Sequence, residues 1–339
     1  MLDNETILVT GGAGFIGSAF IRYVLERKEF VGKIINLDIL TYAGNLNNIS
    51  IELQSNNRYE FIQGAIQDSA LLEKIWKQYA FTMIVHFAAE SHVDRSIASP
   101  DIFIRTNILG TISLLEFVKS HRSVRMHHIS TDEVFGSSDY QKNHTIDAPY
   151  RPNSPYAASK ASADHFVMSY YKTYNAQVTL SYSSNNFGPY QYPEKFIPVI
   201  IRNLIEKKPI PIYGKGEQMR DWIYVNDHVA ALWQFLKSPI NRRKIAFTGE
   251  NHWTNLELVQ KIITIYSFLT CTEEPIYNKL IQFMPDRPGH DYCYSLQKTE
   301  GLAEWNSRKS FSKHIQYTIV WYIDNQDWLH ALKDEEAII

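Results

Sequence analysis

The sequence predicts an α/β fold, a doubly wound parallel sheet of the Rossmann-like kind followed by a smaller C-terminal domain. Three observations support this prediction. An apolar run near the start breaks into glycines and resumes with helical spacing, strand-like and helix-like segments alternate over the first half, and prolines divide the second half into shorter pieces. We expect the first domain to span residues 1–184 and the second 185–339, with a segment at about 222–250 returning to the first.

The first turn carries glycines at an informative spacing. An apolar run precedes it, as suits a buried strand, and the helix-like segment Phe15–Arg27 follows. Both Gly12-x-Gly14-x-x-Gly17 and Gly11-x-x-Gly14-x-x-Gly17 fit a dinucleotide-binding turn, in which glycines permit a tight turn, a close pyrophosphate and close helix packing. The helix N-terminus then offers N–H groups to the phosphates. A glycine turn that only connects two elements is the alternative.

The remaining elements of the first half alternate in type. Further strands are expected at Lys33–Asp38, Tyr59–Ile62, Thr82–Ala89, Val124–Ser130 and Val178–Ser183, and further helices at Ala70–Tyr79, Ile102–Lys119 and Tyr156–Tyr174. Because helices separate the strands, the strands should be parallel and the helices should cover both faces of the sheet. From about Asn185 the pattern changes, and prolines punctuate shorter elements.

The composition excludes several classes of protein. The 339 residues carry a net charge of -2, so no overall basic field points to nucleic acid or to an anionic membrane. No apolar run approaches the roughly 20 residues that span a bilayer, and the N-terminus shows no secretory signal. Two cysteines, Cys271 and Cys293, are too few for a disulfide framework and fit a reducing compartment. We therefore expect a cytoplasmic protein without bound metal, membrane or nucleic acid.

An acidic residue ends the second expected strand. Asp38 lies about 20 residues beyond the glycines, where a carboxylate accepts hydrogen bonds from the adenosine ribose of a dinucleotide. A 2′-phosphate would be repelled there, so the residue favours NAD over NADP. The alternative is a carboxylate that is merely solvated at a strand end.

A tyrosine and a lysine lie four positions apart where a helix is expected. Tyr156 and Lys160 should share one helix face, and a nearby ammonium lowers the pKa of a phenol enough for it to act as a base. Tyr294 and Lys298 have the same spacing. Only the first pair opens a helix after the fifth strand, at the carboxyl edge where such sheets bind ligands, so we interpret Tyr294 as structural.

Two adjacent carboxylates follow the same strand. The sequence Thr131-Asp132-Glu133 comes about 25 residues before Tyr156, at the mouth of the expected sheet. One hypothesis is an acid/base pair in which one carboxyl is protonated and the other ionised. The other is a solvated acidic turn, and the spacing does not decide between them.

Nine further segments carry a resemblance that extends from about residue 7 to 325. They are Leu40–Asn45, Ala88–Ser96, His128–Val134, Ser154–Tyr156, Lys160–Ser162, Ser184–Asn186, Tyr192–Lys195, Arg220–Trp222 and Asp286–Asp291. With them the chain resembles the dTDP-glucose 4,6-dehydratases, a family of extended short-chain dehydrogenases/reductases (extended SDR). The Thr-Asp-Glu triplet is the specific part, because related sugar epimerases and decarboxylases share the glycines and the Tyr/Lys pair but lack it.

The resemblance implies a closed redox cycle on one nucleotide sugar, most simply dTDP-glucose, in deoxysugar biosynthesis. Tyr156 would take the C4 hydroxyl proton while C4 gives hydride to NAD, and Thr131 would hydrogen-bond the C4 oxygen. Glu133 would then remove the C5 proton and Asp132 would protonate the departing C6 hydroxyl. Hydride returns to C6, so NAD is regenerated and can stay bound. The family also implies a homodimer built on a four-helix interface that includes Ile102–Lys119 and Tyr156–Tyr174.

The resemblance also implies binding residues, position by position. The cofactor would be lined by Gly11, Gly14, Phe15, Ile16, Gly17, Asp38, Ile39, Leu40, Thr41, Ile66, Phe87, Ala88, Ala89, Glu90, Thr106, Tyr156, Lys160 and Asn186. The nucleotide sugar would be lined by Ser91, Thr131, Asn185, Lys195, Phe196, Pro211, Ile212, Tyr213, Arg220, Asn255, Asp286, Arg287, Pro288, Gly289 and His290. Lys195, Arg220 and Arg287 are the candidates for the pyrophosphate charge.

The chain departs from the family's pattern at a few positions. Ala65 stands where an Asp is usual beside the adenine, and Phe196 stands where Leu is usual in the nucleotide pocket. Phe135 and Phe187 replace tyrosines, and Gln297 replaces an Asp in a shortened stretch from Ser295 to Trp305. None is a proposed catalytic residue. The alternatives are an NDP-sugar 4-epimerase or another extended-family enzyme, a UDP-sugar 4,6-dehydratase, and a catalytically silent NAD-binding protein.

Overall fold

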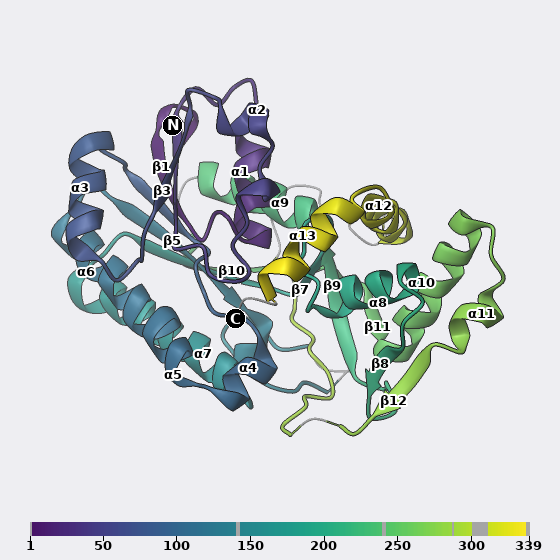
Figure 1. The fold of residues 1–339 in the computed structure, drawn as a ribbon. Helices are drawn as coiled ribbons and strands as arrows, with labels where there is room; N and C mark the ends of the chain where they lie inside the picture. The colour runs from purple at the N-terminus through teal and green to yellow at the C-terminus, as the bar shows by residue number, and fades with distance from the viewer. Residues whose placement is uncertain (1, 140–142, 239–241, 287, 300–310, 337–339) are drawn as a thin grey trace.

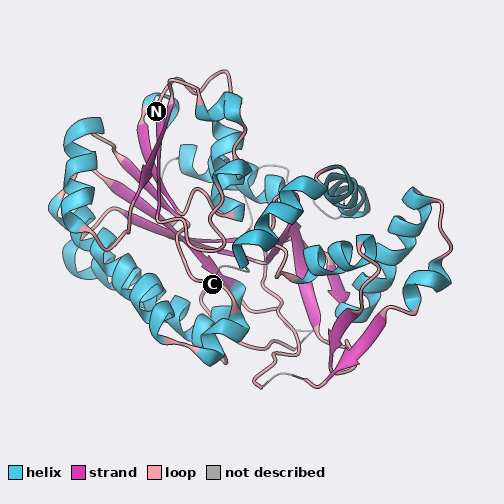
Figure 2. Cartoon of the chain, viewed as in Figure 1, coloured by secondary structure: helices cyan, strands magenta, loops and turns pink. Residues whose placement is uncertain are grey.

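The computed structural model describes residues 2–139, 143–238, 242–286, 288–299 and 311–336. Its centre is a seven-stranded sheet in the order β10-β6-β5-β4-β1-β2-β3, in which every neighbouring pair is parallel (Figure 2). Its strands are β1 (Thr6–Thr10), β2 (Lys33–Asp38), β3 (Tyr59–Gln63), β4 (Met83–His86), β5 (Arg125–Thr131), β6 (Val178–Ser183) and β10 (Lys244–Phe247). The predicted α/β fold class is confirmed.

Helices cover both faces of this sheet, as the burial of its strands requires. Ile7, Leu8 and Val9 of β1 are all fully buried, although adjacent residues of a strand point to opposite faces. Ile7 and Val9 pack in one apolar cluster with α1 and α9, and Leu8 packs in another with α3, α6 and α7 (Figure 1). These helices are α1 (Phe15–Leu25), α3 (Ser69–Tyr79), α6 (Thr111–Ser120), α7 (Pro155–Tyr174) and α9 (Val225–Lys237).

Two predicted elements differ from the structure. The helix expected over Ile102–Lys119 consists of α5 (Asp101–Phe103), a π-helical segment η3 (Ile104–Gly110) and then α6. A π-helical turn widens a helix locally and occurs often at functional sites, and periodicity alone does not reveal it. The fourth strand ends at His86 rather than Ala89, because β4 pairs with β1 and β5 only as far as His86.

The second half forms a smaller layer against the carboxyl edge of the sheet (Figure 1). It contains two small sheets, β11-β9-β7 and β12-β8, and an apolar cluster of its own. Its strands are β7 (Asn185–Phe187), β8 (Ile210–Tyr213), β9 (Met219–Tyr224), β11 (His252–Thr254) and β12 (Ile281–Met284), and its helices are α8 (Phe196–Ile205), α10 (Asn255–Thr270), α11 (Glu274–Asn278), α12 (Phe311–Asp324) and α13 (Gln326–Glu336). Shorter helical pieces elsewhere are η1 (Leu2–Asn4), η2 (Leu46–Asn48), α2 (Ile51–Gln54), α4 (Val93–Ala98) and η4 (Asp132–Phe135). In the described ranges, no helix combines the length and apolarity needed to cross a membrane.

Candidate active site

The glycine turn after β1 leaves no room for side chains at Gly11, Gly12 and Gly17. Gly11 has a φ of +72°, and a Cβ there would lie 2.5 Å from the Ala88 backbone nitrogen. A Cβ on Gly17 would lie 2.2 Å from the Gly11 carbonyl oxygen, so the glycine lets α1 pack on the turn. At Gly14, the N-cap of α1, a Cβ would meet only that carbonyl, at 3.3 Å. The space in front of Gly14 is therefore open, next to the N–H groups of the first helical turn.

Asp38 joins this turn to the next loop. Its Oδ2 accepts from the Ala13 backbone N–H at 2.9 Å, and its Oδ1 accepts from the Leu40 N–H at 2.9 Å. Burial raises the pKa of Asp38, while these backbone donors act in the opposite direction. Leu40 has a φ of +58°, a conformation that this hydrogen bond helps to hold. A carboxylate has further acceptor capacity, so the predicted ribose contact is compatible with these bonds.

The loop after β4 is fixed by a residue that the sequence reasoning missed. The buried Asn107, in the π-helical segment, accepts from the Glu90 N–H at 2.9 Å and donates to the Glu90 carbonyl at 3.0 Å. It also donates to the Ser159 hydroxyl at 2.8 Å. One amide thus ties the β4 loop, which holds the predicted cofactor residues Phe87 to Glu90, to α7. A polar residue at an apolar register of a helix is the only sequence signal for it.

The acidic pair lies at the carboxyl end of β5, as predicted. The Thr131 hydroxyl donates to Asp132 Oδ1 at 3.3 Å and accepts from the Glu133 N–H at 3.3 Å. Asp132 is buried, and its Oδ2 has no hydrogen-bond partner among the described residues. Burial, then Glu133 and Asp221, raise the pKa of Asp132 well above its usual value. Asp132 is therefore a buried carboxyl whose neutral form is favoured, and the solvated acidic turn is excluded for it.

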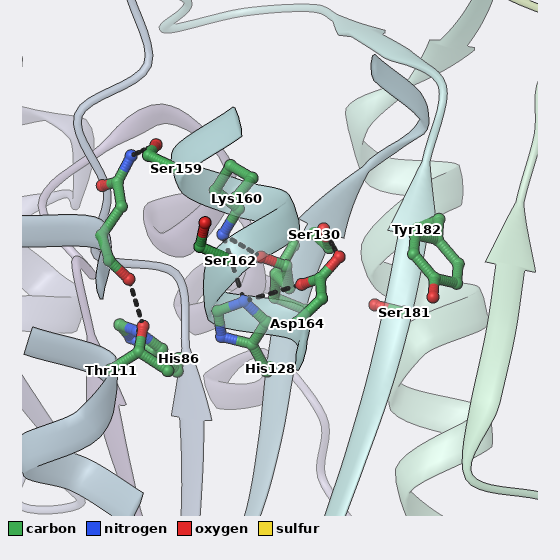
Figure 3. Close-up of polar contacts among 12 residues, drawn as sticks. His86, Thr111, His128, Ser130, Ser159, Lys160, Ser162, Asp164, Ser181 and Tyr182 are labelled. Carbon is green, nitrogen blue, oxygen red and sulfur yellow. Dashed lines mark hydrogen bonds and ion pairs between the residues drawn. The ribbon is translucent and has the colours of Figure 1, made fainter. Parts of the chain in front are cut away.

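Tyr156 faces the same carboxylates, but its pKa is not shifted as the sequence predicted. Burial, then Glu133 and Asp132, raise the pKa of the phenol, and the Thr131 hydroxyl within hydrogen-bonding reach opposes this. Lys160 points away toward β5, where Nζ donates to the Ile129 carbonyl at 2.7 Å (Figure 3). Its ammonium is not one of the largest influences on the pKa of the phenol. The predicted lowering of the Tyr156 pKa by Lys160 is thus wrong for the chain without ligands.

Tyr294, interpreted from its sequence context as structural, lies at this site. Its hydroxyl donates to Asp291 Oδ2 at 2.7 Å and lies 3.4 Å from Glu133 Oε2. The Arg220 guanidinium stacks over its ring, 4.3 Å from the centroid. Because 161 positions separate Tyr294 from Glu133, no local spacing could have revealed the contact.

Arg220, predicted to grip a pyrophosphate, is buried and bonded to backbone. It donates to the carbonyls of Met219 at 2.8 Å and Asp291 at 3.0 Å, and it partly offsets the raised pKa of Asp132. Arg287 lies outside the described residues. Lys195 donates to the Ser91 carbonyl at 2.7 Å, which joins two predicted substrate residues across the two halves of the chain.

The other predicted substrate residues meet around the small β8–β12 sheet. Asp286, after β12, accepts from Gln218 at 3.0 Å, and its Oδ1 lies 2.7 Å from His290 Nδ1. The Asn255 N–H donates to the Gln218 carbonyl at 2.9 Å, which brings the start of α10 to the same place. Nearer the large sheet, Asn185 Oδ1 is buried without a partner in the described part of the chain.

The rest of the predicted cofactor residues fall along the carboxyl edge of the large sheet. Ile66 is buried against Gly110 of the π-helical segment, which also holds Thr106. Asn186 lies in β7, just beyond the end of β6, but its amide already bonds Ser183, Ser184 and His228. Ile39 and Thr41 are exposed beside Asp38. The open space at Gly14, the α1 N-terminus and Asp38 together fit a dinucleotide.

Comparison with known proteins gives consistent relatives. The family model described as GDP-mannose 4,6 dehydratase matches residues 8–318. The dTDP-glucose 4,6-dehydratase of Neisseria meningitidis is 42% identical over 338 residues, covering 95% of this chain and 94% of that protein. The enzyme of the same name from Salmonella typhimurium is 40% identical over 347 residues, covering 96% and 95%.

Solved structures agree with these relatives. The dTDP-glucose 4,6-dehydratase of Bacillus anthracis in complex with NAD has a TM-score of 0.86 at 41% identity and covers 97% of this chain and 99% of that one. The dTDP-glucose 4,6-dehydratase of Streptomyces venezuelae, also solved with NAD bound, has a TM-score of 0.86 at 37% identity, covering 96% and 99%. A UDP-glucose 4-epimerase from Thermotoga maritima, at 24% identity and a TM-score of 0.83, shares the fold.

Proposed function

The chain belongs to the GDP-mannose 4,6-dehydratase family, and from that premise we propose that it is a dTDP-glucose 4,6-dehydratase, an NAD-dependent hydro-lyase. It converts dTDP-glucose into the 4-keto-6-deoxy sugar by oxidation at C4, loss of water across C5 and C6, and reduction at C6. The observation that carries the proposal is the placement of Asp132 and Glu133 against Tyr156 at the end of β5.

The two carboxyl groups suit the elimination step. Asp132 is buried with a raised pKa, so it holds the proton that a departing C6 hydroxyl needs. Glu133 is partly exposed and lies next to it, with Tyr294 and the Thr131 hydroxyl setting its place. We assign it the removal of the C5 proton. An acid and a base held side by side meet the geometric requirement of this elimination.

The residues at C4 are Tyr156 and Thr131. The phenol of Tyr156 lies within hydrogen-bonding reach of the Thr131 hydroxyl, so both can meet one sugar oxygen, with the phenol taking its proton. Bound NAD would supply the hydride acceptor for C4 and the hydride donor for C6. We propose that residues 1–184 hold this cofactor through the glycine turn, Asp38 and Lys160, and that residues 185–339 hold most of the nucleotide sugar.

The test is to incubate the purified protein with dTDP-glucose and to identify the product by mass spectrometry and NMR. A 4-keto-6-deoxy sugar that has lost the elements of water supports the proposal. A C4 epimer that keeps the C6 oxygen would instead support the epimerase, and no conversion would support a silent NAD-binding protein. UDP-glucose in a parallel reaction decides whether thymine or uracil is preferred.

We also propose that the enzyme is a homodimer. Apolar side chains remain exposed on α4, α5, η3 and α7, which pack side by side. They are Ile97, Ile102, Ile104, Leu109, Phe166 and Tyr174. A second copy of the same face would cover them. Light scattering should give a dimer at micromolar concentration, and the double variant Leu109→Asp with Phe166→Asp should give a monomer. A monomeric parent chain would contradict the proposal.

We place the enzyme in the cytoplasm. Cys271 is exposed and Cys293 is buried, and both are free thiols. Unpaired cysteines fit a reducing compartment. Fractionation of cells that express a tagged chain tests this assignment, and recovery with secreted or envelope proteins would refute it.

A further inference from the structure

A buried group of polar side chains surrounds the Lys160 ammonium between β5 and α7. His128 and Ser130 come from β5, while Lys160 and Asp164 come from α7, one helical turn apart (Figure 3). His128 and Asp164 are fully buried, and Lys160 is 4% exposed. No step of the proposed reaction uses His128 or Asp164. His128 contacts Lys160, which the reaction uses, and Asp164 contacts His128.

The contacts of the group converge on one imidazole nitrogen. Lys160 Nζ lies 3.3 Å from His128 Nε2, and Asp164 Oδ1 lies 3.3 Å from the same atom. On its other oxygen, Asp164 accepts from the Ser130 hydroxyl at 2.7 Å. A neutral imidazole nitrogen can donate or accept but cannot do both, so the proton on this atom decides whether His128 faces Lys160 or Asp164 as a partner.

The burial of Lys160 requires compensation. An ammonium withdrawn from water loses its charge unless an anion or strong acceptors stabilise it. Burial lowers the pKa of Lys160 to about 8, and the group that opposes this is Asp164. Burial likewise raises the pKa of Asp164 to about 7, opposed first by Lys160. Each therefore supports the charged form of the other.

We propose that Asp164 is a positioning residue for the reaction, a buried counter-ion that keeps Lys160 charged and seated on the Ile129 carbonyl behind Tyr156. This inference takes the role of Lys160 from the proposed function. The contacts among Lys160, His128 and Asp164 do not depend on that function. Its chemical consequence is a limit on pH, because Asp164 raises the pKa of Lys160 only while Asp164 is ionised, and even then that pKa is about 8.

The other titratable groups around Asp164 contribute little charge. Tyr150 hydrogen-bonds it, and Tyr150 in turn bonds Tyr182 on β6 at 2.5 Å between the hydroxyl oxygens. Both phenols have raised pKa values and stay neutral. His165 on α7 favours the ionised carboxylate slightly. The nearby His86 ring bonds Thr10 and Thr111, and burial holds its pKa low, so it adds no charge.

The experiment compares Asp164→Asn with Asp68→Asn. Asp68 is an exposed N-cap of α3, where Asn caps equally well, so it controls for the substitution itself. We measure kcat and kcat/KM for dTDP-glucose, and separately the dissociation constant of NAD, from about pH 6 to 9. Below about pH 7 the Asp164→Asn variant should match the parent, because Asp164 is then largely protonated in the parent as well. Above about pH 8 the activity and NAD affinity of Asp164→Asn should be about tenfold or more below those of the parent. The reason is that lowering the pKa of Lys160 by one unit lowers the fraction of charged lysine about tenfold at these pH values.

Ser130→Ala is the milder companion variant, for use if Asp164→Asn fails to fold. It removes the hydrogen bond that favours the ionised Asp164 carboxylate. Its activity at alkaline pH should therefore fall below that of the parent, but by less than in Asp164→Asn. An equal loss at every pH would mean a purely structural role and would overturn the proposal, as would parental pH profiles in both variants. If dTDP-glucose proves not to be the substrate, the NAD titrations still decide the role of Asp164 by themselves.

Discussion

The two sides of the active site are built in different ways. On the cofactor side, the glycine turn and Asp38 are joined by a bond between residues 25 positions apart, and the donors are backbone N–H groups. On the acid/base side, Tyr294 meets Glu133 across 161 positions, and the contacts are made by side chains. A backbone arrangement needs particular glycines at a particular spacing, whereas a side-chain arrangement can be assembled from any two segments that the fold brings together.

The same contrast separates two buried aspartates. Both oxygens of Asp38 accept from backbone donors, which stabilise its charge in place. Asp132 has one weak partner in Thr131, and its Oδ2 has none among the described residues. A carboxyl group that accepts several hydrogen bonds suits ligand binding, whereas a buried carboxyl group with few donors keeps a proton that it can donate. The predictions below test this division, beginning with the largest effect.

The carboxylate variants should separate the two halves of the reaction. Asp132→Asn and Glu133→Gln should lower product formation by about 10²–10⁴, the usual cost of losing a general acid or base. Oxidation at C4 does not need them, so the absorbance of reduced nicotinamide should still rise when substrate is added. In Tyr156→Phe both signals should fall together. Turnover close to that of the parent in both carboxylate variants would show that the assigned elimination is wrong.

Two glycine variants should separate folding from cofactor binding. A Cβ at Gly17 would meet the backbone of Gly11 and Gly12 at 2.2 and 2.9 Å, so Gly17→Ala should destabilise the fold by about 1–3 kcal/mol. A Cβ at Gly14 meets little protein, and the φ there is -76°. Gly14→Ala should therefore keep the melting temperature of the NAD-free protein but bind NAD about tenfold more weakly or worse. Thermal melts with and without NAD check both, and unchanged NAD affinity in Gly14→Ala would place the pyrophosphate elsewhere.

The difference between backbone and side-chain contacts explains how much of the structure the sequence predicted. The strands of the first half, the turn at Gly11–Gly17 and the position of Asp132–Glu133 were predictable, because alternation, glycine spacing and strand ends are local patterns. The role of Tyr294 and the inward turn of Lys160 were not, because both depend on which segments meet in space. The pKa of Tyr156 illustrates the limit most clearly. A helical spacing places two residues on one face, but it does not say toward which neighbour a long lysine side chain will point.

Tyr294 offers a smaller test of the acid/base side. Tyr294→Phe keeps the ring under Arg220 but removes the hydroxyl that lies near Glu133 and bonds Asp291. A hydrogen bond to a carboxylate contributes about 1.5–3 kcal/mol, and only part of this acts through Glu133, so we expect the rate of product formation to fall about three- to tenfold, with little change in NAD affinity. Tyr317→Phe, at an exposed position on α12, is the control and should behave as the parent. A loss of NAD affinity in Tyr294→Phe would mean that the two sides are not separable.

The last prediction is on stability rather than activity, and it concerns the proton on Asp132. A carboxyl whose folded-state pKa is raised binds its proton more tightly in the folded than in the unfolded chain, so its contribution to stability is complete at low pH and is lost as the pH rises through the folded-state pKa. Asp132→Asn cannot titrate and should lack this loss. Denaturant unfolding from about pH 4 to 9 should therefore show the free energy of unfolding of the variant rising relative to the parent, by about 1.4 kcal/mol for each pH unit over which only the folded chain keeps the proton. Asp68→Asn, at an exposed position, is the control for the substitution itself. If the parent and Asp132→Asn instead run parallel over the whole range, Asp132 is ionised in the folded chain and cannot be the acid that releases the C6 hydroxyl.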